Sequence, residues 1–241
     1  MIIDAAELDA AHAYKLLIGS IIPRPVAWVS TVSPEGVANL APISFFTAVG
    51  RKPPIVSITL QPQADGVTLK DTFVNIRDTG EFVTSLVTLP QADAMHGSAF
   101  EFEAGVDEFE ALGLRKEPSE VVGAPRVGDA PISFECVVDR IIPVGDDKVD
   151  SVVWGRVVRF HVRDDLYLDR GRIDTAALPA VGRLAGEYTL VENVFTTPLD
   201  RELLAARRGR RMQRLDGRPT GWSPIDTEEW SPSGATTAPG K

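Results

Sequence analysis

The sequence predicts a mainly β protein with the architecture of an antiparallel barrel or sandwich, and three observations support this fold class. Several short segments are rich in β-branched and aromatic residues or alternate polar with apolar positions. Few helical segments separate them, whereas a Rossmann sheet requires strands and helices in regular alternation. The 241 residues, 44% of them hydrophobic, suffice for one large β domain around an ordinary core.

The first half of the chain contains four candidate strands. Residues 25–32 and 37–41 flank a turn signal, Ser-Pro-Glu-Gly at 33–36, and therefore predict a hairpin. Residues 54–60 predict a third strand, in which proline stands at the start, where it disturbs a ladder least. Residues 81–89 predict a fourth.

Helical spacing of apolar residues runs through residues 68–79, and Gly80 ends the pattern. Thr68 and Asp71 resemble a capping box at its start. A shorter helix is expected at residues 107–114.

Two later segments alternate clearly between apolar and polar residues. Residues 132–138 predict a half-buried strand that turns Cys136 inward and Glu135 outward. Cys136 is therefore interpreted as a small buried hydrophobe rather than a nucleophile. In residues 152–162 the inward positions are expected to be Val152, Trp154, Val158, Phe160 and Val162.

Composition excludes several classes of protein. The net charge of −9, from 25 basic and 34 acidic residues, argues against a nucleic-acid-binding surface. One cysteine excludes a disulfide framework, and three widely separated histidines (His12, His96, His161) give no metal-ligand spacing. No signal peptide and no apolar run of roughly 20 residues is present, which predicts a cytoplasmic protein without a membrane span.

The chain is expected to divide into a domain at residues 1–200 and a C-terminal segment at 201–241. Residues 201–218 carry seven Arg and a local charge of +5, and residues 217–241 are rich in Gly, Pro, Ser and Thr, as in a mobile tail. Docking of the Arg-rich segment on an acidic neighbouring subunit is favoured over nucleic-acid binding.

One segment has the chemistry of an anion site. Residues 68–72, Thr-Leu-Lys-Asp-Thr, open the predicted helix and offer backbone N–H groups, a lysine and two hydroxyls. The alternative is that Thr68 only caps the helix while Lys70 faces water, because caps far outnumber phosphate sites.

Several motifs together resemble one family. In order they are RPVA at 24–27, Ser30-Thr31, NLAPISFF at 39–46, PPIV at 53–56, KDTFVNI at 70–76, GVDEF at 105–109, GRVVRFHVRD at 155–164 and RLAGEY at 183–188. This combination, over about residues 14–190, resembles the flavin reductase-like, FMN-binding split-barrel family. The resemblance implies a six-stranded antiparallel Greek-key split barrel with a few short flanking helices, usually a homodimer with FMN near the interface.

The resemblance also implies the cofactor site. FMN would be bound by Arg24, Ser30, Thr31, Asn39, Leu40, Ala41, Pro42, Ser44, Phe45, Phe46, Lys70, Asp71, Thr72, Asn75, Arg183 and Tyr188. Ser44 and Thr72 would bond the phosphate beside Lys70, and the backbone at Leu40 and Ala41 would face the edge of the flavin ring. The alternative for the adjacent rings of Phe45 and Phe46 is that one of them belongs to the core.

The expected function is FMN-dependent transfer of a hydride from NADH or NADPH to flavin, with reduced flavin passed to a partner monooxygenase or a small acceptor. Two alternatives are a flavin-binding electron-transfer module without nicotinamide turnover and a split-barrel oxidase acting on a small substrate. His161 is a candidate catalytic residue that would place the nicotinamide or supply a proton. Its alternative is a hydrogen bond to a carboxylate such as Asp164 or Asp165.

Overall fold

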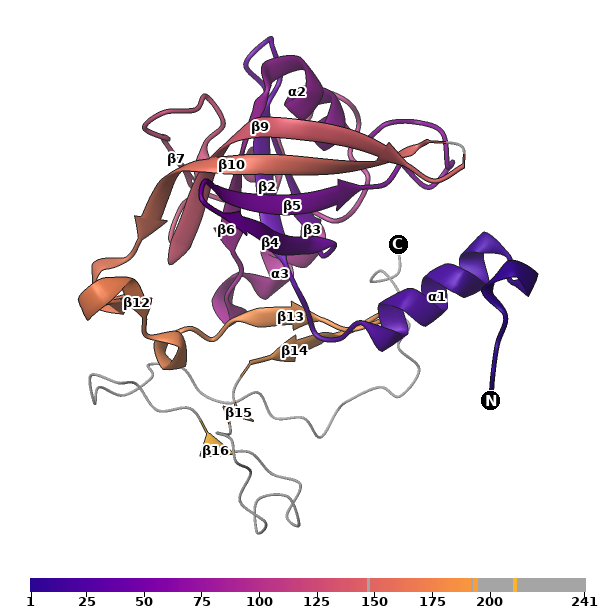
Figure 1. Ribbon diagram of the computed structural model, residues 1–241. Coiled ribbons are helices and arrows are strands. Elements are labelled where there is room, and N and C mark those ends of the chain that lie inside the picture. The colour runs from indigo at the N-terminus through magenta and orange to yellow at the C-terminus, as the bar shows by residue number, and fades with distance from the viewer. Residues whose placement is uncertain (147, 192, 195–209, 212–241) are drawn as a thin grey trace.

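The computed structural model describes residues 1–146, 148–191, 193–194 and 210–211 (Figure 1). Its centre is an antiparallel sheet in the order β3-β2-β6-β9-β10-β5-β4. The prediction of a mainly β fold is confirmed, but the sheet has seven strands where six were expected. The sheet is open between its edge strands β3 and β4, because no ladder joins them although only two residues separate them in the chain.

The main strands are β2 (Ala27–Val32), β3 (Ala38–Ile43), β4 (Phe46–Arg51), β5 (Pro54–Leu60), β6 (Glu81–Leu86), β9 (Ile132–Val144) and β10 (Asp150–Val162). All but β4 were expected at about these positions, although β9 runs six residues beyond its predicted end. The sequence did not predict β4, whose residues are mostly exposed and do not alternate. It forms because its backbone pairs with β5, which is a tertiary contact.

Smaller elements surround this sheet. A second sheet holds β1 (Arg24–Pro25), β13 (Val181–Arg183) and β14 (Tyr188–Leu190). Two-stranded pairs join β7 (Lys116–Glu117) to β8 (Arg126–Val127), β11 (Tyr167–Leu168) to β12 (Arg172–Ile173), and β15 (Asn193–Val194) to β16 (Arg210–Arg211). The α-helices are α1 (Ala10–Ser20), α2 (Asp71–Thr79), α3 (Ala92–Gly97) and α4 (Glu108–Ala111). Short 3₁₀ turns lie at Ala5–Glu7, Leu89–Gln91, Asp164–Leu166, Asp169–Gly171 and Thr175–Ala177.

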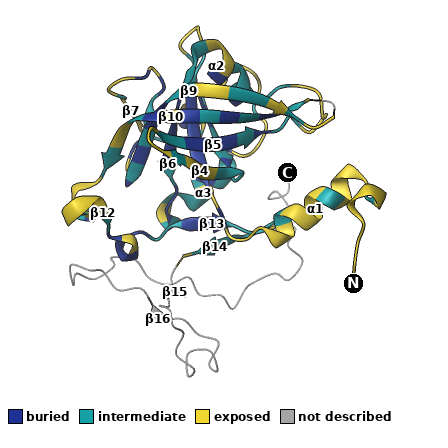
Figure 2. Ribbon diagram, in the orientation of Figure 1, coloured by how far each residue is buried: buried dark blue, intermediate teal, exposed yellow. Residues whose placement is uncertain are grey.

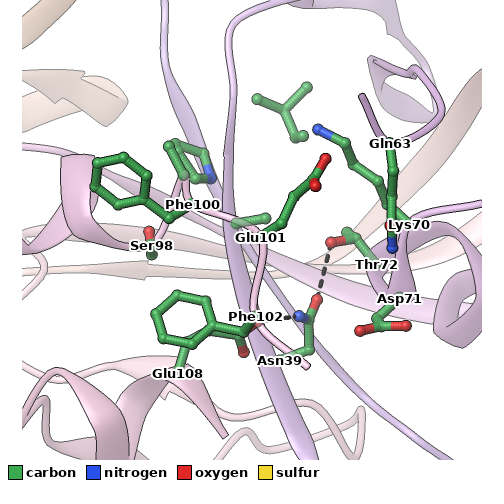
Figure 3. Close-up of a pocket in the computed structure, with 14 residues that line it drawn as sticks. Asn39, Gln63, Lys70, Asp71, Thr72, Ser98, Phe100, Glu101, Phe102 and Glu108 are labelled. Carbon is green, nitrogen blue, oxygen red and sulfur yellow. Dashed lines mark hydrogen bonds between the residues drawn. The ribbon is translucent and has the colours of Figure 1, made fainter. Parts of the chain in front are cut away.

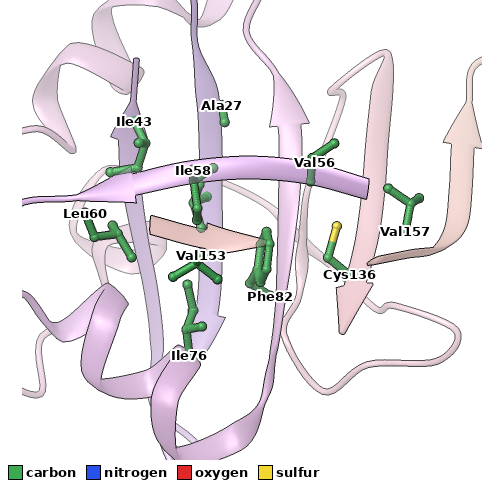
Figure 4. Close-up of a cluster of buried hydrophobic side chains, with 11 residues drawn as sticks. Ala27, Ile43, Val56, Ile58, Leu60, Ile76, Phe82, Cys136, Val153 and Val157 are labelled. Atoms are coloured by element: carbon green, nitrogen blue, oxygen red, sulfur yellow. The ribbon is translucent and has the colours of Figure 1, made fainter. Parts of the chain in front are cut away.

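The core lies between the sheet and α2, where Ile76 from the helix meets Phe82 and the inward residues of β5 and β10 (Figure 4). Cys136 belongs to this cluster, and burial raises the pKa of its thiol, as expected for a buried hydrophobe.

The predicted inward face of residues 152–162 is wrong. Val153 and Val157 face the core, whereas Phe160 is 55% exposed. The buried residues Ser151, Val153, Gly155 and Val157 do alternate along β10, but in the opposite phase to the predicted one. One extra residue of β10, Val158, interrupts the pairing with β9 only after them. Gly155 faces the ring of Phe82 so closely that an added Cβ would lie 2.3 Å from its Cζ.

Helix α2 begins three residues later than expected. Lys70 occupies the N-cap without a side-chain cap, so the predicted capping box of Thr68 and Asp71 does not form. The Thr68 hydroxyl donates to Asp65 in the preceding turn, a local bond that outcompetes the cap. Gly80 ends the helix with a φ of +74°, as its position in the sequence indicates.

Helix α1 projects away from the barrel, and none of its residues is buried (Figures 1 and 2). Its exposed side chains include Tyr14, Leu16 and Leu17. Within the described part of the chain, no helix combines the length and the apolar character needed to cross a membrane. The predicted mobile tail and all of the Arg-rich segment except Arg210 and Arg211 lie outside the described residues.

Candidate functional site

A buried polar network joins β3 to the first turn of α2. Its centre is Asn39, whose Oδ1 accepts from Thr72 Oγ1 at 2.8 Å and from Thr31 Oγ1 at 3.3 Å. Asn75 Nδ2 donates to Thr31 Oγ1 at 3.0 Å. The predicted residues Thr31, Asn39, Thr72 and Asn75 are thus brought together and are all buried. Buried polar groups linked in this way hold one another in single rotamers.

Glu108, from the first turn of α4, completes this network. It is 5% exposed, and its carboxylate accepts from Asn39 Nδ2 at 2.7 Å and from Leu40 N at 2.9 Å (Figure 3). Burial raises the pKa of Glu108, and these two hydrogen bonds oppose the rise. Glu108 therefore fixes both the side chain of Asn39 and the backbone of β3 from below the cavity.

A cavity of about 170 Å³ opens above this network, and we refer to it as the lysine cavity. Lys70 stands on its wall together with the start of α2 (Figure 3). The first-turn N–H groups of α2 receive no side-chain cap, which leaves the positive end of the helix open to an anion. The lining residues are Asn39, Ala41, Pro42, Ile43, Gln63, Lys70, Asp71, Thr72, Ser98, Ala99, Phe100, Glu101, Phe102 and Glu108.

A second cavity, of about 310 Å³, adjoins the first and is referred to as the arginine cavity. Its lining residues are Tyr14, Arg24, Val26, Pro42, Ser44, Met95, His96, Ala99, Phe100, Arg183, Ala185 and Tyr188. The two cavities share Pro42, Ala99 and Phe100. Together they form a groove, with the ammonium group of Lys70 at one end and the guanidinium groups of Arg24 and Arg183 at the other.

The structure divides the predicted phosphate ligands between these cavities. Thr72 and Lys70 line the lysine cavity, whereas Ser44 lines the arginine cavity and accepts from Arg24 Nε at 3.3 Å. Ala41, Pro42 and Asp71 also line the lysine cavity, and Arg183 and Tyr188 line the arginine cavity. The expected cofactor residues thus flank a single groove, but Ser44 and Thr72 do not share a cavity.

Other predicted residues support the groove without lining either cavity. Ser30 is fully buried and its hydroxyl donates to the carbonyl of Pro125. The N–H of Leu40 donates to Glu108, which lines the lysine cavity. Phe46 packs against the core, and Phe45 lies 6.3 Å from the ring of Tyr14, measured between ring centroids.

His161 lies in a different place from the other predicted site residues. Its Nε2 lies 2.5 Å from Oε1 of Glu135, and it lines a third cavity with Arg115, Glu117 and Phe160. Its partner is thus a carboxylate, as the alternative interpretation held, but it is Glu135 rather than Asp164 or Asp165. No contact of His161 with either cavity of the groove is found among the described residues.

Glu135 lies on the face of β9 opposite Cys136, as predicted, but it is fully buried, so the expectation of a half-buried strand is wrong at this position. The segment between β7 and β8 covers this face, and its Glu120, Val121 and Val122 N–H groups donate to the carboxylate at 2.8, 2.7 and 3.1 Å. Burial by itself would raise the pKa of Glu135, but these donors and His161 lower it to about 2.

Sequence reasoning missed Glu108, His96, Gln63 and Phe100 at the groove. His96 Nδ1 lies 3.3 Å from the hydroxyl of Tyr188, 92 residues further along the chain. Such pairs carry no local signal, because the contact exists only once α3 and β14 meet. The sequence indicated Glu108 only weakly, as one residue of the GVDEF motif at 105–109.

Several known proteins are similar to this chain. The model of the flavin reductase like domain matches residues 18–177. Nitrilotriacetate monooxygenase component B from Bacillus cereus is 40% identical, with 81% of this chain and 98% of that chain covered and a TM-score of 0.77. The 2-nitrobenzoate 2-nitroreductase NbaA of Pseudomonas fluorescens is 30% identical, with 83% and 98% covered and a TM-score of 0.71. A split barrel domain from Shewanella frigidimarina, 20% identical over 83% of this chain and 100% of that chain, shares the fold with a TM-score of 0.71.

Proposed function

Because this chain belongs to the family of flavin reductase-like domains, we propose that it is an NAD(P)H-dependent flavin reductase that binds FMN in the groove. The observation that carries the proposal is the pair of joined cavities with the open end of α2 and Lys70 at one end. Pockets for ligands of this size are roughly 300–1,000 Å³ in volume. The lysine cavity, at about 170 Å³, is too small for a whole flavin nucleotide, so the flavin ring would extend from it past Pro42 and Phe100.

The residues present fit FMN in charge and in shape. Lys70 and the uncapped N–H groups of α2 would bind the phosphate, with Thr72 held beneath them by Asn39. Pro42 and Phe100, which both cavities share, would flank the flavin ring. When bound, FMN accepts a hydride from NADH or NADPH and passes electrons on, so the protein need not supply a nucleophile.

Three acidic residues line the lysine cavity, so binding of a phosphate there depends on the positive charge of Lys70. Glu101 binds the N–H of Ala64 at 2.8 Å, Glu108 points toward β3, and Asp71 belongs to the helix itself. Lys70 is the one cationic side chain among the residues that line this cavity. Its ammonium group would offset part of the negative charge of these acids and attract the phosphate.

The acceptor of the electrons is proposed from the neighbours. One is named a component of a monooxygenase, which supports delivery of reduced flavin to a partner monooxygenase. A second candidate function is direct reduction of a small aromatic substrate. The neighbour named 2-nitrobenzoate 2-nitroreductase and the aromatic, positively charged lining of the arginine cavity favour it.

Lys70→Met tests the cofactor site. We expect the dissociation constant of FMN to rise about tenfold and that of riboflavin, which lacks the phosphate, to stay the same. Quenching of flavin fluorescence measures both, and anaerobic addition of NADH then reports bleaching of the bound flavin. Lys52→Met, at an exposed position between β4 and β5, is the control. Equal loss of FMN and riboflavin affinity, or no flavin binding by the unaltered protein, contradicts the proposal.

Helix α1 supports a homodimer. Leu17 is 53% exposed on this projecting helix, and the carbonyls of Ile18 and Ile21 accept from Arg24, which ties its C-terminal end to the arginine cavity. An exposed apolar helix is typical of an interaction surface. A second copy of the chain would bury it beside the groove.

Leu17→Glu is therefore expected to convert the dimer to a monomer, because a carboxylate would be desolvated in the interface. Light scattering coupled to size-exclusion chromatography gives the mass. Lys15→Gln on the same helix, which removes an exposed charge, should leave the mass unchanged. A Leu17→Glu protein that keeps the dimer mass would refute this interface.

A further inference from the structure

The arginine cavity holds a buried positive charge that the described chain does not balance. Arg24 is 6% exposed, and its N–H groups donate to uncharged oxygens only: Ser44 Oγ and the carbonyls of Ile18, Ile21 and Leu184. Within the described residues, neither Arg24 nor Arg183 forms an ion pair with Asp or Glu. Buried charges in proteins are ordinarily paired, which indicates that an anion from outside completes this site.

A second guanidinium adds to this charge. Arg24 and Arg183 are direct partners in the register of β1 and β13. Burial lowers the pKa of Arg24, and the charge of Arg183 lowers it further. Two guanidinium groups at one cavity, where no acidic side chain is among the lining residues, repel each other until an anion binds.

The shape of the cavity favours an anion that carries an aromatic ring. The guanidinium carbon of Arg183 lies over the Tyr188 ring, 4.5 Å from its centroid. His96 stands edge-on to Phe100 and to Tyr188, with ring centroids 5.5 and 5.9 Å apart. These rings form an apolar wall beside the cationic group, and a planar guanidinium matches a carboxylate in two parallel hydrogen bonds.

We propose that the arginine cavity is the binding site for the carboxylate of a small aromatic acid, with Arg183 binding the carboxylate and Phe100 and Tyr188 contacting the ring. Arg24 supplies charge from behind, because most of its donors are already engaged. This inference rests on the proposed function, since the acid would be the substrate beside a flavin bound across Pro42 and Phe100.

Isothermal titration of the full chain loaded with FMN tests the site, with benzoate and its uncharged analogue benzamide as probes. We expect saturable binding of benzoate and binding of benzamide weaker by at least about tenfold. Arg183→Gln should weaken benzoate binding by about tenfold or more and leave benzamide binding unchanged. Arg159→Gln, an exposed arginine of β10 that lines neither cavity, is the matched control and should bind benzoate like the unaltered protein.

If the anion that binds in the arginine cavity comes from FMN or from the nicotinamide dinucleotide, these titrations give different results. If Arg183→Gln weakens FMN but not riboflavin, the anion is the flavin phosphate and the inference is overturned. If nicotinamide mononucleotide binds in an Arg183-dependent manner and benzoate does not, the anion belongs to the dinucleotide and the inference is again overturned. If FMN fails to bind at all, the proposed function fails, while Arg183-dependent benzoate binding to the flavin-free chain would still support the carboxylate site.

Discussion

Replacing Glu135 with alanine is expected to lower the free energy of unfolding by about 3–5 kcal/mol, the range found when one partner of a buried charged pair is removed. The fully buried carboxylate binds three N–H groups of residues 120–122 and also His161, which is 20% exposed. Its removal leaves these donors without an acceptor. Urea unfolding followed by circular dichroism gives the difference.

Asp139→Ala is the control, because this acid lies on the same strand but is exposed. We expect it to change the free energy of unfolding by less than about 0.5 kcal/mol. A similar small change for Glu135→Ala would show that the carboxylate does not hold the segment between β7 and β8 in place.

The same carboxylate predicts a dependence of stability on pH. The folded-state pKa of Glu135 is about 2, below the usual value of 4.5, so its stabilisation is complete above the usual value and is lost as the pH falls toward 2. A shift of this size corresponds to about 3 kcal/mol. The difference in unfolding free energy between the unaltered protein and Glu135→Gln should therefore shrink between pH 5 and pH 2, and a constant difference would contradict the assignment.

Replacing Glu108 with alanine is expected to weaken both the fold and the cofactor site. The change leaves Asn39 Nδ2 and the Leu40 N–H buried without an acceptor, at a cost of about 1–3 kcal/mol for each group. Because Asn39 also accepts from Thr72 beneath the lysine cavity, the affinity for FMN should fall about tenfold. Urea unfolding and quenching of flavin fluorescence measure the two effects.

Glu110→Ala in the same helix is the control. Its exposed carboxylate pairs with Lys116 at 3.1 Å, and exposed pairs contribute roughly 0–1 kcal/mol. Burial raises the pKa of Glu108, so ionisation of this group reduces stability as the pH rises, the reverse of Glu135. If Glu108→Ala destabilised the protein yet bound FMN normally, the link from Glu108 through Asn39 to the groove would be disproved.

Local patterns in the sequence determined most of the fold. Turn chemistry at residues 33–36 and residue patterns along the strands place β2, β3 and β5 close to their observed bounds and fix the start of β9. Gly80 ends α2 because a left-handed residue is needed there, which a single sequence position specifies. The family motifs likewise identify the two segments, 39–46 and 70–76, whose residues Asn39 and Thr72 meet at the lysine cavity.

Only the tertiary structure decided the details that depend on distant contacts. Packing against the core cluster turned Val153 and Val157 inward, in the opposite phase to the alternation read from the sequence. The cover over β9 made Glu135 a buried carboxylate and gave His161 its partner. Alternation of polar and apolar residues shows which side chains of a strand share a face. It does not show whether another segment of the chain covers the polar face. The two positive charges of the arginine cavity also depend on a distant contact, because Arg24 and Arg183 become neighbours only when β1 pairs with β13.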